Sequence, residues 1–153
     1  MSLITISSIV ASRILYPELI IKTVTSLSSI STNIIKSVHY LLTISKDDII
    51  LQKELTKSDI IQDISIIKSF IEEKRFDNES HTILACIDNL NQTLIELEIK
   101  IHSITEKLHN HEKLWVRYFR SYNIEKEKEL IPILIEKLRH RFNLLIKISS
   151  IIH

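Results

Sequence analysis

The feature that most constrains the fold is a long row of apolar side chains between residues 83 and 118. Its members lie alternately four and three residues apart: Ile83, Ile87, Leu90, Leu94, Leu97, Ile101, Ile104, Leu108, His111, Trp115 and Tyr118. Because an α-helix has 3.6 residues per turn, this spacing brings every member to one face of a single helix, at the a and d positions of a coiled-coil-like heptad. An apolar face this long is unstable in water, so the spacing predicts that other helices cover it.

The composition also favours helices. The 153 residues contain no glycine and two prolines, whereas tight β-turns depend on residues that tolerate positive φ, glycine above all. Hydrophobic residues make up 44% and charged residues 25% of the chain, as is typical of a globular protein. We therefore expect residues 1–153 to form one helical-bundle domain, with residues 1–16 as a candidate for a loosely attached segment.

The first half of the chain divides into several predicted helices. The residue before Pro17 resists the α conformation, so we expect a short N-terminal helix to end near Tyr16 and a second helix to run from Pro17 to about Ile44. Capping signals at 45–48 and 56–59 follow. The stretch from Asp48 to Leu55 is either a short helix or the start of the next one, which carries apolar residues from 60 to 71.

The second half contains the two remaining helices. The long helix follows a polar loop, with Asn78 or Ser80 as its N-cap. The final helix is expected to begin near Lys128 or Glu129, which places Pro132 in its first turn, where proline is tolerated. Short loops favour antiparallel neighbours. The sequence thus predicts an all-α fold, an antiparallel four-helix bundle with a short extra N-terminal helix.

The charges and the cysteine indicate an intracellular protein without a targeting segment. The net charge is +1, but residues 46–99 are acidic and residues 100–153 basic, so we expect the two regions to neutralise each other within the bundle. The single cysteine, Cys86, suits a reducing compartment and a buried thiol. No basic residue precedes the first apolar residues, which argues against a signal peptide. We expect a cytoplasmic location.

One group of residues has the spacing of metal ligands. His102, Glu106 and His109 share a helical face, and Glu106 to His109 matches the Glu-x-x-His of di-iron bundles. Such sites need a second Glu-x-x-His, which the chain lacks, and the heptad places all three residues outward. We therefore expect no metal and no cofactor.

His111 is the one polar member of the apolar row. A buried histidine needs a hydrogen-bond partner, and Glu136 on the final helix is a candidate. The interpretation we favour is a core histidine satisfied by a carboxylate or a carbonyl, and the alternative is a buried polar switch formed by His111 and Glu136.

Basic and aromatic residues are interleaved near the end of the long helix. Arg117 and Arg120, with Arg139 and Arg141 from the final helix, resemble a single-stranded nucleic-acid site. Trp115 and Tyr118 belong to the apolar row, however, so we expect core packing with ion pairs at its rim. Since no phosphate-binding glycine loop, nucleophile elbow or paired cysteine is present, we expect no enzyme.

The segments His111–Tyr122 and Leu138–Ile146, with a weaker echo at Leu55–Ile60, resemble uncharacterised small helical proteins of large amoeba-infecting DNA viruses of the mimivirus type. The resemblance covers about the second half of the chain. It implies a viral origin, in the host cytoplasm or the virion, and no activity.

Ile95 and Ile99 form a second apolar pair outside the row. They favour a non-enzymatic module that binds a protein partner or a second copy of itself. The alternative is peripheral membrane association through an apolar helix at residues 1–15. Nucleic-acid binding through the four arginines is the least favoured of the three.

Overall fold

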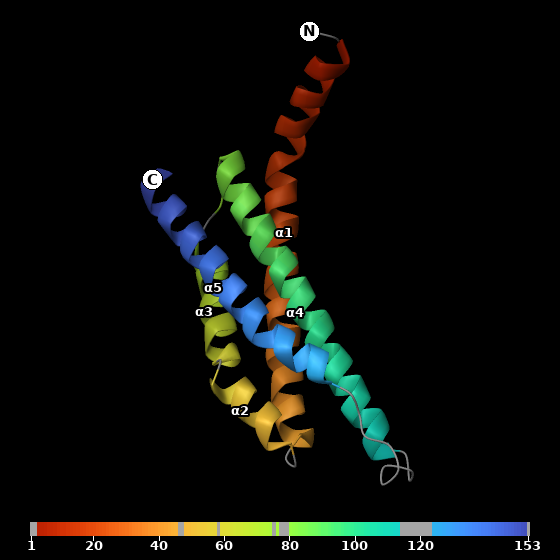
Figure 1. The fold of residues 1–153 in the computed structure, drawn as a ribbon. Coiled ribbons are helices and arrows are strands. Elements are labelled where there is room, and N and C mark those ends of the chain that lie inside the picture. Colours follow the sequence, from red (N-terminus) through yellow and green to blue (C-terminus); the bar gives the residue numbers. More distant parts are fainter. Residues whose placement is uncertain are drawn as a thin grey trace.

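The computed structural model describes residues 3–45, 48–57, 59–74, 76, 80–113 and 124–152, and only the backbone at 3–20, 111–113 and 152. Within these stretches the regular structure is entirely helical, which confirms the all-α prediction (Figure 1). The helices are α1 (Leu3–Ile44), α2 (Ile49–Lys57), α3 (Ile60–Glu73), α4 (His81–Lys113) and α5 (Glu125–Ile152).

The helices form two layers. In Figure 1, α4 and α5 lie side by side and cross over α1 and α3, while α2 sits at the end of the bundle where α1 finishes. Helix α4 packs extensively against both α1 and α5, and α1 also packs against α3. Helix α4 is therefore the element that joins the two layers, as the length of its apolar row requires.

Side-chain pairs give the direction of each neighbour. Glu127 near the start of α5 contacts Lys107 near the end of α4, so these two helices run in opposite directions. Ser28 in α1 hydrogen-bonds to Glu72 at the end of α3, and these two helices are also antiparallel. Tyr40 and His109 lie near the ends of α1 and α4 and are joined at 3.3 Å. Since α1 and α4 therefore run in the same direction, an antiparallel arrangement does not describe every packed pair.

The apolar row of α4 is the centre of the core. Its eight members from Ile83 to Leu108 are at most 4% exposed, as the spacing predicts. They pack with buried residues of all the other helices, among them Leu27, Ile34, Leu41, Leu51, Ile64, Ile67, Leu138 and Leu145. The side chains of His111, Trp115 and Tyr118 lie outside the described residues.

The predicted short helix at the N-terminus is wrong. Helix α1 continues without interruption from Leu3 through Pro17 to Ile44. Inside a helix, proline removes one backbone donor, its ring crowds the carbonyl four residues back, and it disfavours the α conformation of the residue before it. Helical turns on both sides maintain the remaining hydrogen bonds, so the local preference does not end the helix.

The last helix also begins earlier than predicted, at Glu125 instead of Lys128 or Glu129. Ile124 is buried, and its carbonyl accepts a hydrogen bond from the Lys128 backbone N–H at 2.9 Å. Burial of Ile124 thus places the first turn of α5 upstream of the predicted start at Lys128 or Glu129. Pro132 consequently lies inside α5 rather than in its first turn.

The short helix α2 is separate from α3. Asp59 adopts the left-handed conformation (φ 53°, ψ 38°) and breaks the helical path. Asp48 caps α2 by accepting a hydrogen bond from the Leu51 N–H at 3.0 Å. Ser80 caps α4 through the Ile83 N–H at 3.3 Å, which confirms the second of the two predicted candidates.

Candidate interaction surface

The outward side of the α4/α5 layer carries exposed isoleucines. Ile95 and Ile99 are 37% and 58% exposed, so the structure agrees with their expected position off the core. Ile133 of α5 is 60% exposed. We call this region the α4–α5 face and define it by Ile95, Glu96 and Ile99 of α4 and Ile133 and Lys137 of α5.

An ion pair bridges the two helices on this face. The Lys137 ammonium lies 3.7 Å from a Glu96 carboxylate oxygen, and both side chains are about half exposed, so the pair itself adds little stability. Ile133 precedes Lys137 by one helical turn and Ile99 follows Glu96 by three residues. The two isoleucines therefore flank the ion pair on the same outward side of α4 and α5.

The exposed charges on both helices are mixed in sign. On α4 the exposed charged residues are Asp88, Glu96, Glu106 and Lys107, and on α5 they are Glu125, Lys126, Glu129, Glu136 and Lys147, while Lys137 is of intermediate exposure. The ion pair of Glu96 with Lys137 nevertheless joins the acidic middle of the sequence to its basic end.

Polar contacts fix the position of α5 on α4. The Arg141 guanidinium donates to the Asn89 carbonyl at 2.8 Å and to the hydroxyl of buried Thr93 at 2.5 Å. Glu127 accepts from Lys107 at 2.6 Å and from Ser103 at 3.3 Å. The hydrogen bond from Lys107 lowers the pKa of the Glu127 carboxyl, although partial burial opposes this shift.

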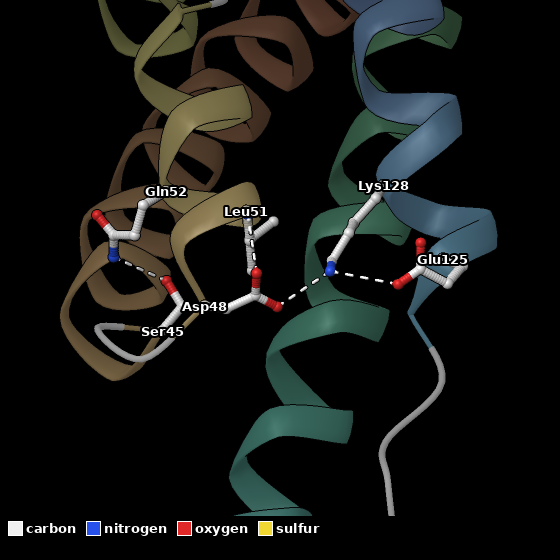
Figure 2. A network of polar contacts seen from close by, with 6 residues as sticks. All are labelled: Ser45, Asp48, Leu51, Gln52, Glu125 and Lys128. Atoms are coloured by element: carbon white, nitrogen blue, oxygen red, sulfur yellow. Dashed lines mark hydrogen bonds and ion pairs between the residues drawn. The ribbon is translucent and has the colours of Figure 1, made fainter.

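A second polar network holds the end of the bundle together (Figure 2). The Lys128 ammonium lies 3.0 Å from Asp48 and 3.4 Å from Glu125. The side chains of Asp48 and Lys128 are each only 10% exposed. Gln52 donates to the Ser45 hydroxyl at 3.0 Å and to the Leu42 carbonyl at 2.7 Å. The turn between α1 and α2 is thereby tied to the first turn of α5.

The surroundings of Lys128 shift its pKa. Burial by itself lowers the pKa of Lys128, but the hydrogen bond and charge of Asp48, together with Glu125, outweigh that effect and raise the pKa above its ordinary value. Lys128 therefore keeps its positive charge at neutral pH. Its role is structural, because it joins segments that are distant in the sequence.

The four arginines do not form a basic surface in the described part of the chain. Arg139 donates from Nε to Asp63 of α3 at 2.6 Å, and Arg141 is bonded to α4 as described above. Arg117 and Arg120 lie outside the described residues. Two of the four arginines of the predicted nucleic-acid site, Arg139 and Arg141, thus make contacts within the bundle.

The register of α4 and α5 separates His111 from Glu136. Lys137 lies opposite Glu96, which is 15 residues, or about 22 Å, from position 111 along α4. Glu136 itself is exposed. The side chain of His111 lies outside the described residues, but its place in the helix does not bring it level with Glu136.

Two of the three residues with metal-ligand spacing face outward, as the heptad predicts, and the third does not. His102 and Glu106 are exposed and 3.4 Å apart, whereas His109 is partly buried and its ring lies 3.3 Å from the Tyr40 hydroxyl of α1. The described residues contain no group of three or more histidine, cysteine, aspartate or glutamate side chains able to hold a metal ion. Cys86 is buried, and burial raises the pKa of its thiol.

The first turns of α1 project beyond the other helices (Figure 1). Among the described helices none combines the length and the apolar character needed to cross a bilayer. The side chains of the candidate membrane segment, residues 1–15, lie outside the described residues. The backbone of this segment therefore extends past the helices that pack on the rest of α1 (Figure 1).

Sequence reasoning missed Ile133 and the pair of Asp48 with Lys128. Ile133 adjoins Pro132 and lies outside the apolar stripe of the last helix. That position predicts an exposed side chain, but other isoleucines of the chain show the same pattern equally clearly. The ion pair had no signal, because 80 residues separate its members.

Comparisons of the chain with protein-family models, with curated proteins and with solved structures return no match.

Proposed function

We propose that this chain is a non-enzymatic helical-bundle module that binds a protein partner through the α4–α5 face. The observation that carries the proposal is the group of exposed isoleucines Ile95, Ile99 and Ile133 around one ion pair. Covering an isoleucine side chain that is half exposed contributes on the order of 1 kcal/mol. Three such side chains on one face favour association more than an isolated exposed residue does.

Rigidity of the face also supports this role. Both helices are held by buried side chains and by the contacts of Arg141 and Glu127, so the face is already formed before a partner binds. A preformed face lowers the entropic cost of association. The charged residues beside the isoleucines supply specificity for the orientation of the partner. The proposal includes a cytoplasmic or virion location, the latter on the resemblance of the second half alone.

The test is affinity purification of the tagged full chain from its native cell, followed by mass spectrometry. Wild type is compared with the double variant Ile99→Glu/Ile133→Glu and with the control Ile66→Glu. Ile66 is a 50% exposed isoleucine on α3, in the other layer. We expect proteins that wild type and the control retain to be lost, at least tenfold, from the double variant. Equal recovery in all three would contradict the proposal.

A second candidate function is peripheral membrane binding through residues 1–15, favoured by the projection of α1 beyond the bundle (Figure 1). An apolar helix at a membrane surface gains energy in proportion to its buried area. Flotation with liposomes compares the full chain with a chain lacking residues 1–16. Membrane binding predicts that only the full chain floats, and equal flotation would eliminate this candidate.

A further inference from the structure

We propose that α2 is a latched segment, which detaches from the bundle as a unit while the other four helices stay packed, and that the ion pair of Asp48 with Lys128 holds it closed. Figure 1 shows α2 at the end of the bundle where α1 finishes. Four features support this device: the small share of the core that α2 supplies, its packing on α1, the turns at its two ends and its tie to α5.

Helix α2 supplies few buried side chains. Of its nine residues, Leu51 and Leu55 are buried, whereas eight members of the apolar row of α4 are. A helix this short is unstable in water by itself, so α2 depends on its contacts with the bundle. Since the stabilisation from burial grows with the apolar area covered, detaching α2 costs much less than unfolding the whole chain.

The packing of α2 on α1 is incomplete. An open hollow of about 570 Å³ is lined by Leu42 of α1 and by Ile49, Gln52, Lys53 and Thr56 of α2. Helices that pack closely fill such a space with side chains. Gln52 donates from its amide nitrogen to the Leu42 carbonyl at 2.7 Å and to the Ser45 hydroxyl at 3.0 Å. Along this side α2 is thus joined to α1 by the hydrogen bonds of one glutamine and not by close packing.

Turns at both ends allow α2 to move without bending another helix. Before α2, the Asp48 backbone N–H donates to the Ser45 carbonyl at 2.9 Å. After it, Asp59 takes the left-handed conformation (φ 53°). Motions that displace an element as a unit are absorbed by a few residues at the ends of that element. The two turns are therefore the positions about which α2 moves.

The other four helices are joined by contacts that do not involve α2. Arg139 of α5 donates to Asp63 of α3 at 2.6 Å, and Arg141 of α5 donates to Thr93 of α4 at 2.5 Å. Helix α1 packs directly against α3 and α4. These helices therefore remain together when α2 leaves.

The latch joins the start of α2 to the first turn of α5 (Figure 2). The side chains of Asp48 and Lys128 are each 10% exposed and lie 3.0 Å apart, so salt screens this pair less than an exposed one. Detachment of α2 moves Asp48 away and leaves Lys128 with Glu125, which is exposed. Because the pair stabilises the closed state alone, its two charges set the population of the open state.

Native-state hydrogen exchange of the full-length chain tests the proposal. The amides of residues 52–57 in α2 are compared with those of residues 90–104 in α4, at urea concentrations below the unfolding transition. We expect the α2 amides to share one opening constant, at least a hundredfold larger than that of the α4 amides. Their exchange should depend little on urea, because the opening exposes little surface, whereas exchange in α4 should rise steeply.

Removing either charge should release α2. We expect Lys128→Met and Asp48→Asn each to increase the opening constant of α2 at least tenfold, since each breaks the nearly buried pair, and asparagine keeps the cap of the helix. Lys53→Met, at an exposed lysine of α2 itself, is the control and should match wild type. Circular dichroism confirms that each variant remains helical.

Four results would overturn the inference. The first is equal exchange and equal urea dependence in α2 and α4, since α2 would then open only with the whole chain. The second is exchange in α2 as fast as in an unfolded peptide, because no closed state would exist. The third is exchange graded from the ends of α2, which indicates fraying. The fourth is an α2 opening constant that either charge variant leaves unchanged, which excludes the ion pair as the latch.

Discussion

Lys128 and Asp48 illustrate how single side chains hold this bundle together. Each side chain is 10% exposed, and they lie 3.0 Å apart, at one end of the molecule. Asp48 also caps α2, so one carboxylate serves both a helix terminus and an ion pair (Figure 2). Removing one member of a buried pair leaves the other charged and without its partner, which costs more than removing both.

We predict that Lys128→Met lowers the free energy of unfolding by about 3 kcal/mol. The double variant Asp48→Asn/Lys128→Met should lose less, because asparagine keeps the cap of α2 and the only charge left without Lys128 is that of Glu125, which is exposed to solvent. Urea denaturation measures both values. Lys53→Met, at an exposed lysine of α2, is the control with little expected change. A double variant less stable than Lys128→Met would contradict this account.

Glu127 makes the stability of the chain dependent on pH. Its folded-state pKa lies below the ordinary value of 4.5, because Lys107 donates to the carboxylate. A group with a lowered pKa contributes its full stabilisation above pH 4.5 and loses it as the pH falls through the folded-state pKa.

We therefore expect wild type to be more stable than Glu127→Gln at pH 7, by about 1–2 kcal/mol, and the difference to shrink steadily below pH 4.5. Urea denaturation between pH 7 and pH 3 measures it. Glu129→Gln, at an exposed carboxylate of the same helix, should show no comparable trend. A wild-type advantage that stays constant down to pH 3 would exclude Glu127 as its source.

Among the elements, the junction of α2 and α3 shows how a chain without glycine makes a left-handed turn. Asp59 takes φ 53°, a conformation that costs most residues about 1 kcal/mol and glycine nothing. Aspartate is among the residues that tolerate it best. This turn separates α2 from α3, whereas the sequence alone allowed either one continuous helix or two helices.

We predict that Asp59→Gly is at least as stable as wild type and that Asp59→Ala is less stable by about 1 kcal/mol. At Lys53, inside α2, the order should reverse, since glycine costs about 1 kcal/mol relative to alanine in a helix. Thermal unfolding of the four variants measures both orders. Equal stability of the glycine and alanine variants at position 59 would show that the left-handed turn is not maintained in solution.

For the whole molecule, partner binding through the α4–α5 face has a thermodynamic consequence. A partner that binds only the folded state stabilises it by mass action. We expect the Tm of wild type to rise when a partner recovered by affinity purification is added, and the Tm of the double variant Ile99→Glu/Ile133→Glu to stay constant. Differential scanning calorimetry with and without the partner measures both shifts. Equal shifts in the two proteins would contradict binding through this face.

The sequence by itself determined the helical class, the length of the central helix up to the described Lys113, and the burial of its apolar row. These follow from the 3.6-residue period and from burial of apolar side chains, both of which can be read along the chain. Ser80 as the cap of α4 was also predictable, because capping involves residues three apart.

Only the tertiary structure decided which helices touch, that Pro17 does not end α1, and that Asp48 pairs with Lys128. It also placed Ile133 level with Ile99 and kept Glu136 away from the position of His111. Each of these depends on packing between segments far apart in the sequence, and no local periodicity encodes such distances. The candidate surface therefore required the pairing of α4 with α5, whereas the core within α4 required only the spacing of its side chains.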